Sequence, residues 1–191
     1  MPRKTDPSRR PEILDAVVDY IADNGIAELS LRPLAKALGQ STFVLTYHFG
    51  DKDGLIAAAL EHFEAKHRDT LRSWDPNAPL KDAIRRYWRT ITKDRNLRLL
   101  RVSLELATSG PPQFGAKMTT DWVDFATEGF LIRGLDRRCA RAEATLLVAT
   151  MTGLLMDVLT TGDIRRANEA LERFLEASMS PARGYATQSS K

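Results

Sequence analysis

Only one segment of this 191-residue chain alternates like a β-strand, and the chain offers it no partner strand. Aromatic and aliphatic side chains occupy every second position of residues 41–49, STFVLTYHF. Such a run favours a strand by propensity. A lone strand, however, leaves its backbone N–H and C=O groups without hydrogen bonds, and both flanking segments have helical periodicity. We therefore predict a short helix whose surface residues serve a purpose other than helix formation.

Helical periodicity and helix-breaking residues divide the rest of the chain into eight further segments. We expect Gly25 and Gly39 to end the first two helices. The Ser30 hydroxyl is expected to accept from the first turn of the second helix, and Asp51 is expected to cap the fourth. The eight segments cover residues 8–25, 30–39, 51–73, 80–93, 96–108, 113–134, 138–160 and 164–178. The sequence thus predicts an all-α fold of nine helices without a sheet.

The composition is typical of a soluble globular protein, with 43% hydrophobic and 28% charged residues. The single cysteine excludes an intramolecular disulfide and a multi-cysteine zinc site, which fits a reducing compartment. Residues 144–156 form the longest strongly apolar stretch, whereas a membrane-spanning helix needs about 20 apolar residues. No signal-peptide-like apolar run follows the N-terminus. We expect a cytoplasmic protein without membrane attachment or cofactor.

Residues 30–55 have the order of a helix-turn-helix unit: a helix, a tight Gly-containing turn at 39–41, a short helix and a further helix. The expected core of this unit consists of Leu34, Ala35, Leu38, Leu45, Phe49 and Leu55. That core leaves four side chains of the short helix pointing outward: Thr42, Phe43, Thr46 and Tyr47. A helix of this kind fits the major groove of DNA, where hydroxyls bond base edges and apolar groups meet thymine methyls. We hypothesise that Phe43 makes such a methyl contact.

Two cations stand where DNA phosphates would be bound. Lys52 lies in the first turn of a helix, where backbone N–H groups already favour phosphate. Arg32, near the start of the second helix, can reach a phosphate or pair with guanine. Taken singly, each cation has an ordinary alternative as a solvated surface charge, His48 as a packing residue, and the aromatic side chains as core.

At this point the sequence resembles the TetR family of bacterial one-component regulators over residues 10–60. The matching residues are Ile13, Ala16, Asn24, Gly25, Leu31, Arg32, Leu34, Ala35, Leu38, Gly39, Ser41, Leu45, His48, Phe49, Lys52 and Leu55. The resemblance implies DNA contacts by Arg32, Thr42, Phe43, Val44, Thr46, Tyr47, His48 and Lys52, to which we add Gln40 and Ser41 of the turn. The family usually has a tyrosine where this chain has Thr46. The neighbouring Tyr47 can take over the phosphate or base contact of that ring. The family usually has valine at Gln40, which here is more exposed or contacts DNA.

The C-terminal two thirds are expected to bind a small molecule and to form a homodimer, as the resemblance implies. Large adaptable side chains suit an apolar ligand, and we expect these to line its pocket: Trp88, Met118, Trp122, Phe125 and Met151. Small residues on an all-round apolar helix, with apolar positions on the last helix, predict a two-fold four-helix interface: Ala149, Thr152, Gly153, Ile164, Leu171, Phe174 and Leu175. Burial within the chain is the alternative for both sets.

Enzyme signatures are weak in this sequence. It contains no Gly-rich phosphate loop, HExxH or GxSxG motif. His62 and His67 fall on different helix faces, so a shared metal is not expected. Glu61 and Glu64 are read as solvated charges. Arginines near Cys139 favour a lowered pKa, which would suit a redox sensor, but an ordinary helix-surface cysteine is the preferred interpretation.

The sequence therefore predicts a flexible basic arm at 1–7, a DNA-binding domain at 8–55, a ligand-binding and dimerisation domain at 56–180 and a tail at 181–191. The expected function is a ligand-responsive DNA-binding transcriptional regulator, a repressor that binds a palindromic operator as a dimer. An all-α enzyme or a ligand-binding bundle without specific DNA binding is the alternative. A general polyanion binder is disfavoured, because residues 1–55 carry seven basic and eight acidic side chains.

Overall fold

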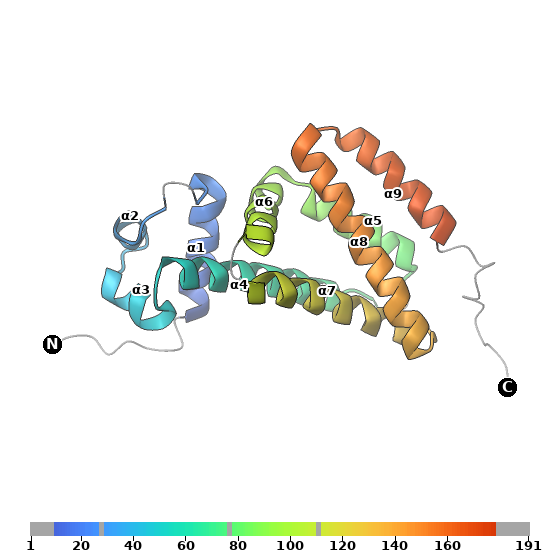
Figure 1. The fold of residues 1–191 in the computed structure, drawn as a ribbon, viewed down its shortest axis with the longest axis horizontal. Helices are drawn as coiled ribbons and strands as arrows, with labels where there is room; N and C mark the ends of the chain where they lie inside the picture. Colours follow the sequence, from blue (N-terminus) through green and yellow to red (C-terminus); the bar gives the residue numbers. More distant parts are fainter. Residues whose placement is uncertain (1–9, 27–28, 76–77, 110–111, 179–191) are drawn as a thin grey trace. The chain divides into compact units, whose positions relative to one another are not determined.

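The computed structural model describes residues 10–26, 29–75, 78–109 and 112–178. These residues form nine α-helices and no strand, which confirms the all-α prediction (Figure 1). The helices are α1 (Arg10–Asn24), α2 (Leu31–Ala37), α3 (Thr42–Phe49), α4 (Lys52–Arg72), α5 (Leu80–Ile91), α6 (Asp94–Ser109), α7 (Pro112–Ile132), α8 (Arg137–Thr161) and α9 (Ile164–Ser178). The predicted basic arm and C-terminal tail lie outside the described residues.

The strand-like segment is helix α3, as predicted from its lack of a partner. Gly25 and Gly39 follow the ends of α1 and α2 with φ angles of 70° and 61°, in the left-handed region that glycine tolerates best. The predicted Ser30 cap is wrong in one respect: Ser30 occupies the N-cap position, but its side chain makes no capping hydrogen bond. Pro33 stands three residues later and has no N–H to donate there.

The chain packs into two compact units. The first comprises Met1–Thr70 with Lys93–Met118, and the second Leu71–Thr92 with Thr119–Lys191. In the first unit, α1 packs against α6 and α2 against α3. Its fully buried side chains include Val17, Ile21, Leu34, Leu45, Leu55, Leu60 and Leu99. Because these packing units cut through α4 and α7, the functional boundary at residues 55 and 56 stays a prediction.

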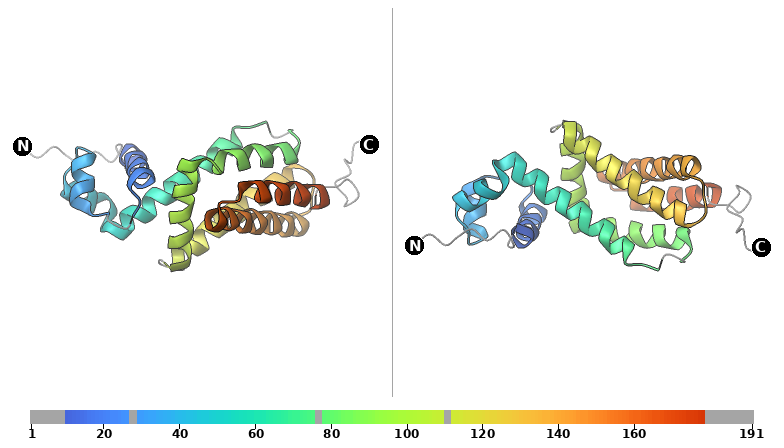
Figure 2. Two further views of the ribbon diagram at one scale, coloured as in Figure 1. Left: turned by 90° about the horizontal axis from the view of Figure 1, so that it is seen from above. Right: turned by 90° about the horizontal axis from the view of Figure 1, so that it is seen from below.

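The second unit contains α5, most of α7, and the helices α8 and α9, which run side by side in opposite directions (Figures 1 and 2). Phe130, Leu171 and Leu175 are fully buried in it. Its longest helix, α8, is long and apolar enough to cross a membrane by length and composition alone. A core helix passes the same test, and α8 contributes five residues to the buried core: Ala140, Ala144, Met151, Leu155 and Val158.

Candidate nucleic-acid interface

The turn between α2 and α3 is built by local backbone hydrogen bonds. The N–H of Gln40 donates to the carbonyl of Ala35 at 2.8 Å, and the N–H of Gly39 donates to Lys36 at 3.2 Å. These bonds satisfy the last carbonyls of α2 and redirect the chain within three residues. The Ser41 hydroxyl then accepts from the N–H of Val44 at 3.2 Å and caps α3. Ser41 therefore has a structural role in addition to its predicted place at the DNA surface.

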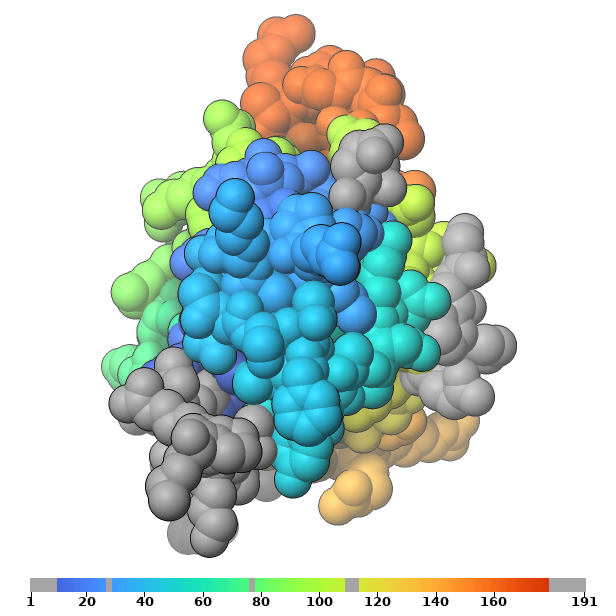
Figure 3. All heavy atoms as spheres, turned by 90° about the vertical axis from the view of Figure 1, so that its left-hand side faces the viewer, coloured from blue at the N-terminus to red at the C-terminus, as the bar shows by residue number. Residues whose placement is uncertain are grey.

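Helix α3 has one buried residue, Leu45, and presents its opposite face to solvent. Phe43 and Tyr47 are 69% and 64% exposed, and Thr42 and Thr46 are exposed beside them. The two aromatic rings stack with centroids 6.2 Å apart and planes 28° apart. In Figure 3 the side chains of α2 and α3, blue to cyan, lie at the surface of their unit. The predicted outward set is thus confirmed in its orientation.

Three further predicted DNA-contact residues of the turn and α3, which we call the reading segment (residues 39–49), are half-buried. Val44 and Gln40 are half-buried, and the His48 ring meets Tyr47 edge-on with centroids 5.2 Å apart. The Tyr47 ring therefore has two aromatic neighbours, Phe43 and His48, although most of its surface stays exposed.

The junction between α3 and α4 is tight. Gly50 has a φ of 81°, and a Cβ added to Gly54 would lie 2.4 Å from the carbonyl oxygen of Phe49. Only glycine permits this approach of the two backbones. The Asp51 carboxylate accepts from the Gly54 N–H at 2.8 Å, which confirms the predicted cap. The junction of Gly50 and Asp51 places half-buried Lys52 at the first position of α4.

Cations from three other positions lie in the same unit as α3. Arg32 and Lys36 are exposed one turn apart on α2, and α2 packs against α3. The Arg10 guanidinium lies over the Phe49 ring, 5.2 Å from its centroid. Sequence reasoning missed Lys36 and Arg10 as site residues. Spacing from Arg32 could have identified Lys36, whereas the contact of Arg10 with α3 joins segments that are far apart in sequence.

The acidic residues of α1 are directed towards α4 and α6. Asp15 pairs with Lys66 at 2.7 Å and with His62 at 2.8 Å, and the hydrogen bond from Lys66 is the main cause that lowers the Asp15 pKa. One and two turns later, Asp19 pairs with Arg95, and Asp23 lies 4.0 Å from Arg98. The negative charges that make residues 1–55 acidic are therefore compensated by cations from outside that segment.

Two of the histidine and glutamate residues of α4 considered for metal binding or catalysis, His67 and Glu64, are explained by packing and burial. Among the described residues, no group of three or more His, Cys, Asp or Glu side chains could hold a metal ion. Burial lowers the pKa of His67 to about 4, with a smaller effect of Arg95. The reading of Glu64 as a solvated charge is wrong, because Glu64 is buried on the inner face of α4.

The expected lowering of the Cys139 pKa is also wrong. The Cys139 thiol is exposed, and its interaction with the Asp136 carboxylate raises its pKa. Asp136 caps α8 by accepting from the N–H groups of Arg138 and Cys139, which places its negative charge beside the thiol. The arginines lie nearby, but the cap outweighs them.

The predicted ligand-binding residues belong to both units. Trp88, Trp122, Phe125 and Met151 lie in the second unit and Met118 in the first. Trp88 is buried and its indole donates to Asn168 on α9 at 2.6 Å. Trp122 and Phe125 are half-buried, with ring centroids 5.9 Å apart. The ring of Tyr87 lies 5.4 Å from that of Trp122. These contacts form an aromatic cluster of the second unit that the sequence only partly identified.

The predicted dimer residues divide into exposed and buried ones. Ala149, Thr152, Gly153 and Ile164 are exposed, and Phe174 is half-buried. The exposed residues of α8 continue along one helical stripe: Ala142, Leu146, Ala149, Gly153 and Met156. Leu171 and Leu175 are buried within the chain at 2% and 0% exposure, so their side chains are not available to a partner.

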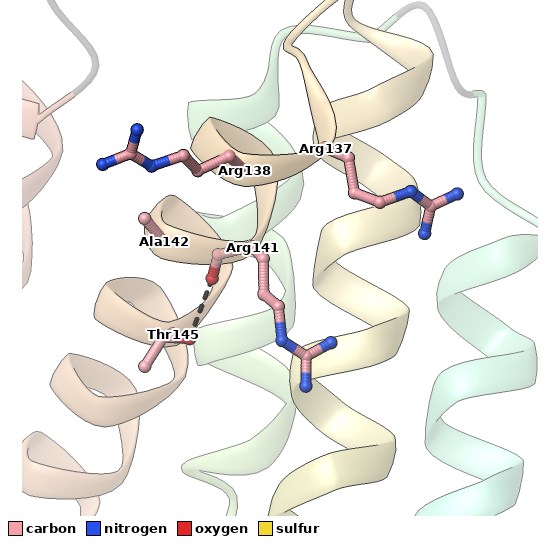
Figure 4. Close-up of a pocket in the computed structure, with 5 residues that line it drawn as sticks. All are labelled: Arg137, Arg138, Arg141, Ala142 and Thr145. Atoms are coloured by element: carbon pink, nitrogen blue, oxygen red, sulfur yellow. Dashed lines mark hydrogen bonds between the residues drawn. The ribbon is translucent and has the colours of Figure 1, made fainter.

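An open hollow lies at the start of α8, lined by Arg137, Arg138, Arg141, Ala142 and Thr145 (Figure 4). Figure 4 shows the Arg138 side chain pointing away from those of Arg137 and Arg141, so the three guanidinium groups do not converge on one point. Arg141 also pairs with Asp124 at 2.9 Å. None of these residues belongs to the predicted ligand-binding set.

The sequence is similar to known bacterial regulators. The family described as bacterial regulatory proteins, tetR family, matches residues 13–59. The HTH-type transcriptional regulator BetI of Stenotrophomonas maltophilia is 35% identical over 88 residues, which cover 46% of this chain and 38% of that protein. BetI of Paraburkholderia phymatum is 22% identical over 89% of this chain and 94% of that protein. Where the identity exceeds 30%, as for BetI of Stenotrophomonas maltophilia, the chain matches less than half of the relative's own length.

Solved structures share the fold over nearly the whole chain. A multidrug binding protein, EbrR, complexed with imidazole, has a TM-score of 0.66 and 29% identity, covering 91% of this chain and 93% of that one. GusR of Salmonella enterica has a TM-score of 0.68 and 20% identity, covering 92% of this chain and 97% of that one. The likeness of fold therefore extends beyond the segment that matches in sequence.

Proposed function

Because the chain is a TetR-family protein by its N-terminal sequence and its fold, we propose that it is a DNA-binding transcriptional regulator controlled by a small molecule. In this proposal a dimer binds a palindromic operator in the cytoplasm and represses transcription until the effector releases it. The observation that carries the proposal is the exposed face of α3, supported by the residue-by-residue family match around it.

The geometry of the reading segment supports DNA as the ligand. α3 is an eight-residue helix joined to α2 by the four residues 38–41, and it carries its exposed side chains on one face. A major groove accepts one helix of this size. Arg10, Arg32, Lys36 and Lys52 belong to the same unit and supply the charges that phosphates require. The role of each predicted contact residue is part of the proposal.

The effector is proposed to be a small, mainly apolar molecule bound by the helices that follow the reading unit. EbrR, which has the same fold, is described as a multidrug binding protein. In the present chain, half-buried Trp122 and Phe125 offer ring faces and edges to a ligand. Trp88 and Met151 are buried in the core of the same unit, whereas the predicted Met118 belongs to the first unit.

Control then follows from linkage between two binding equilibria. An effector that binds more tightly to a conformation with the wrong spacing of the two α3 helices lowers the affinity for DNA. Successive major grooves on one face of DNA lie about 34–36 Å apart, so both readers must hold that spacing. Helix α4 begins beside the reader and is the proposed lever between the two functions.

The test is a mobility-shift titration with DNA from upstream of the protein's own gene. A Tyr47→Ala/Lys52→Ala double variant is expected to lose at least about a hundredfold in affinity, because it removes a groove contact and a phosphate contact from each half-site. An Arg89→Ala/Ile132→Ala variant is the matched control, since it removes one exposed cation and one exposed apolar side chain from the second unit. Equal binding by all three proteins would reject the proposed interface.

A further inference from the structure

Phe43 and Tyr47, the aromatic pair on α3, are largely exposed to solvent. Phe43 and Tyr47 are, with Ile132, the most exposed large hydrophobic side chains of the described residues. They lie four residues apart and stack on each other, so their exposed ring surfaces form one apolar patch. An exposed aromatic patch next to polar residues is typical of a binding surface. A ligand of this surface should therefore offer apolar groups to the two rings.

The hydrogen-bonding side chains of α3 are those of Thr42, Thr46, Tyr47 and His48, and the helix itself uses the hydroxyl proton of Thr46. Its sequence, TFVLTYHF, contains no Arg, Lys, Asn, Gln, Asp or Glu. The side chains that pair bidentately with guanine or adenine are therefore absent from α3. The Thr46 hydroxyl lies 3.1 Å from the carbonyl oxygens of both Thr42 and Phe43, to which it donates. With its proton used in this way, the Thr46 hydroxyl has no donor left for a base edge, and the methyl is the apolar group that this exposed side chain can offer.

The surrounding charges favour duplex DNA over an apolar protein partner. Lys52 begins the helix after α3, and Arg32 and Lys36 lie on the helix that packs against α3. The Arg10 guanidinium lies over the Phe49 ring. A patch of rings flanked by four cations is complementary to a groove flanked by phosphates. In the major groove the thymine 5-methyl is the apolar group that base edges offer.

The distance between the two rings is larger than the spacing of successive base pairs in DNA. The centroids of Phe43 and Tyr47 lie 6.2 Å apart. Successive bases along one strand of B-DNA rise by about 3.4 Å, so the two rings cannot both lie at the same base pair level when α3 runs along the groove. Rings this far apart along a groove are placed to meet methyl groups of different base pairs.

We propose that Phe43 and Tyr47, with the Thr46 methyl, recognise the operator through 5-methyl groups of neighbouring pyrimidines. This inference rests on the proposed DNA-binding function and names the chemical group of the bases that the protein recognises. Thymine and 5-methylcytosine carry the same methyl in the same place, so the α3 surface accepts either base where it makes only the methyl contact. Cytosine methylation in a half-site then raises affinity for this protein.

The experiment begins with selection of binding duplexes from a random pool, followed by titration of one selected operator. Thymines in the half-sites are replaced one at a time by uracil, which removes only the methyl. Loss of one contacted methyl is expected to weaken binding about fourfold per half-site, which corresponds to about 0.8 kcal/mol. Replacing a contacted thymine–adenine pair by 5-methylcytosine–guanine is expected to bind more tightly than unmethylated cytosine–guanine at that position.

Protein variants assign the effect to the rings. Phe43→Ala is expected to bind more weakly and to lose discrimination between thymine and uracil at one position of each half-site. Ile132→Ala, which truncates an equally exposed side chain at the end of α7, is expected to keep it. Because Phe43 is exposed, its truncation leaves the core intact.

The outcomes separate this inference from the proposed function. If selection yields no specific duplex, the proposed function fails and this inference fails with it. If specific duplexes are found but uracil binds as well as thymine at every position, methyl recognition is wrong while DNA binding stands. If uracil weakens binding equally for the original protein and for Phe43→Ala, the methyl acts through DNA shape and the assignment to Phe43 is overturned.

Discussion

Single residues of this protein have very different tasks although they lie on the same helices. On α4, Leu55 and Leu60 fill the core, Lys66 pairs with Asp15, and His67 is a titratable ring held largely away from water. The ring of His67 packs against Phe63 with centroids 4.3 Å apart. Such an environment disfavours the charged imidazolium, and this has a measurable consequence.

The His67 side chain makes stability depend on pH. Its pKa of about 4 in the folded protein lies below the ordinary value of 6.5, so between these values the unfolded chain binds more protons. The contribution of His67 to the free energy of unfolding is therefore fully present above pH 6.5. It is lost as the pH falls towards 4 and amounts to at most about 3 kcal/mol. Urea unfolding at several pH values in this window should show the slope.

A His67→Gln variant isolates this effect. The slope between pH 6.5 and 4 is expected to be smaller in the variant, because glutamine does not titrate. The hydrogen bonds from Lys66 and Arg85 are the main causes that lower the pKa values of Asp15 and Glu172 from 3.8 and 4.5. As the pH falls from about these values, both proteins lose the stability that the two carboxylates contribute, so this loss overlaps only the acid end of the window and is common to both proteins. An unchanged slope in the variant would show that the histidine is not buried as described.

At the scale of elements, the contact of α1 with α6 links the reading unit's first helix to the part of the chain that follows α5. The Arg98 side chain donates from Nε to the carbonyl oxygen of Ala22 at 2.5 Å, and Arg95 pairs with Asp19. Together with Asp15 and its partners on α4, these contacts hold α1 on two sides. Each pair is partly exposed, so their number matters more than any one of them.

A charge-reversal cycle tests the contact of α1 with α6. Asp19→Lys and Arg95→Glu each place like charges opposite one another and are expected to lower the free energy of unfolding by up to about 1 kcal/mol. The double variant restores an attractive pair in reversed orientation and is expected to recover most of the loss. Denaturant midpoints of the four proteins measure the coupling, and purely additive losses would mean that the two side chains do not interact.

At the scale of the molecule, the outer stripe of α8 is the surface with which the proposed dimer would form. Leu146 and Met156 are each 44% exposed at the two ends of a central pair of small residues, Ala149 and Gly153. Small residues at the centre permit close approach of a second helix, and the larger side chains add apolar area. A two-fold axis near the centre would place Leu146 against Met156 of the second copy.

Ala149→Glu is expected to convert the dimer into a monomer, because it buries two unpaired carboxylates at the centre of the interface. Sedimentation at micromolar concentration measures the mass, and operator affinity is expected to fall with it, since one reader covers one half-site. Ala116→Glu, the same substitution at an exposed position of α7, is the control and should stay dimeric. A dimeric Ala149→Glu protein would exclude this stripe as the interface.

The sequence by itself determined the helices and the outward face of the reader. Apolar periodicity, glycine stops and the Asp51 cap act within a few residues, and the lack of a partner strand made residues 41–49 a helix against their propensity. The exposure of Phe43 and Tyr47 followed from the burial of Leu45, because a short helix exposes the face opposite its core residue.

Only the tertiary structure decided which partners the remaining residues have. The placement of Arg10 on Phe49, the pairing of α1 carboxylates with α4 and α6, and the burial of Glu64 all join segments that are distant in the chain. Leu171 and Leu175 fill the chain's own core, whereas the α8 stripe stays exposed, although both patterns look alike in sequence. Periodicity tells which side of a helix is apolar; the packing of distant helices decides which apolar side is already covered.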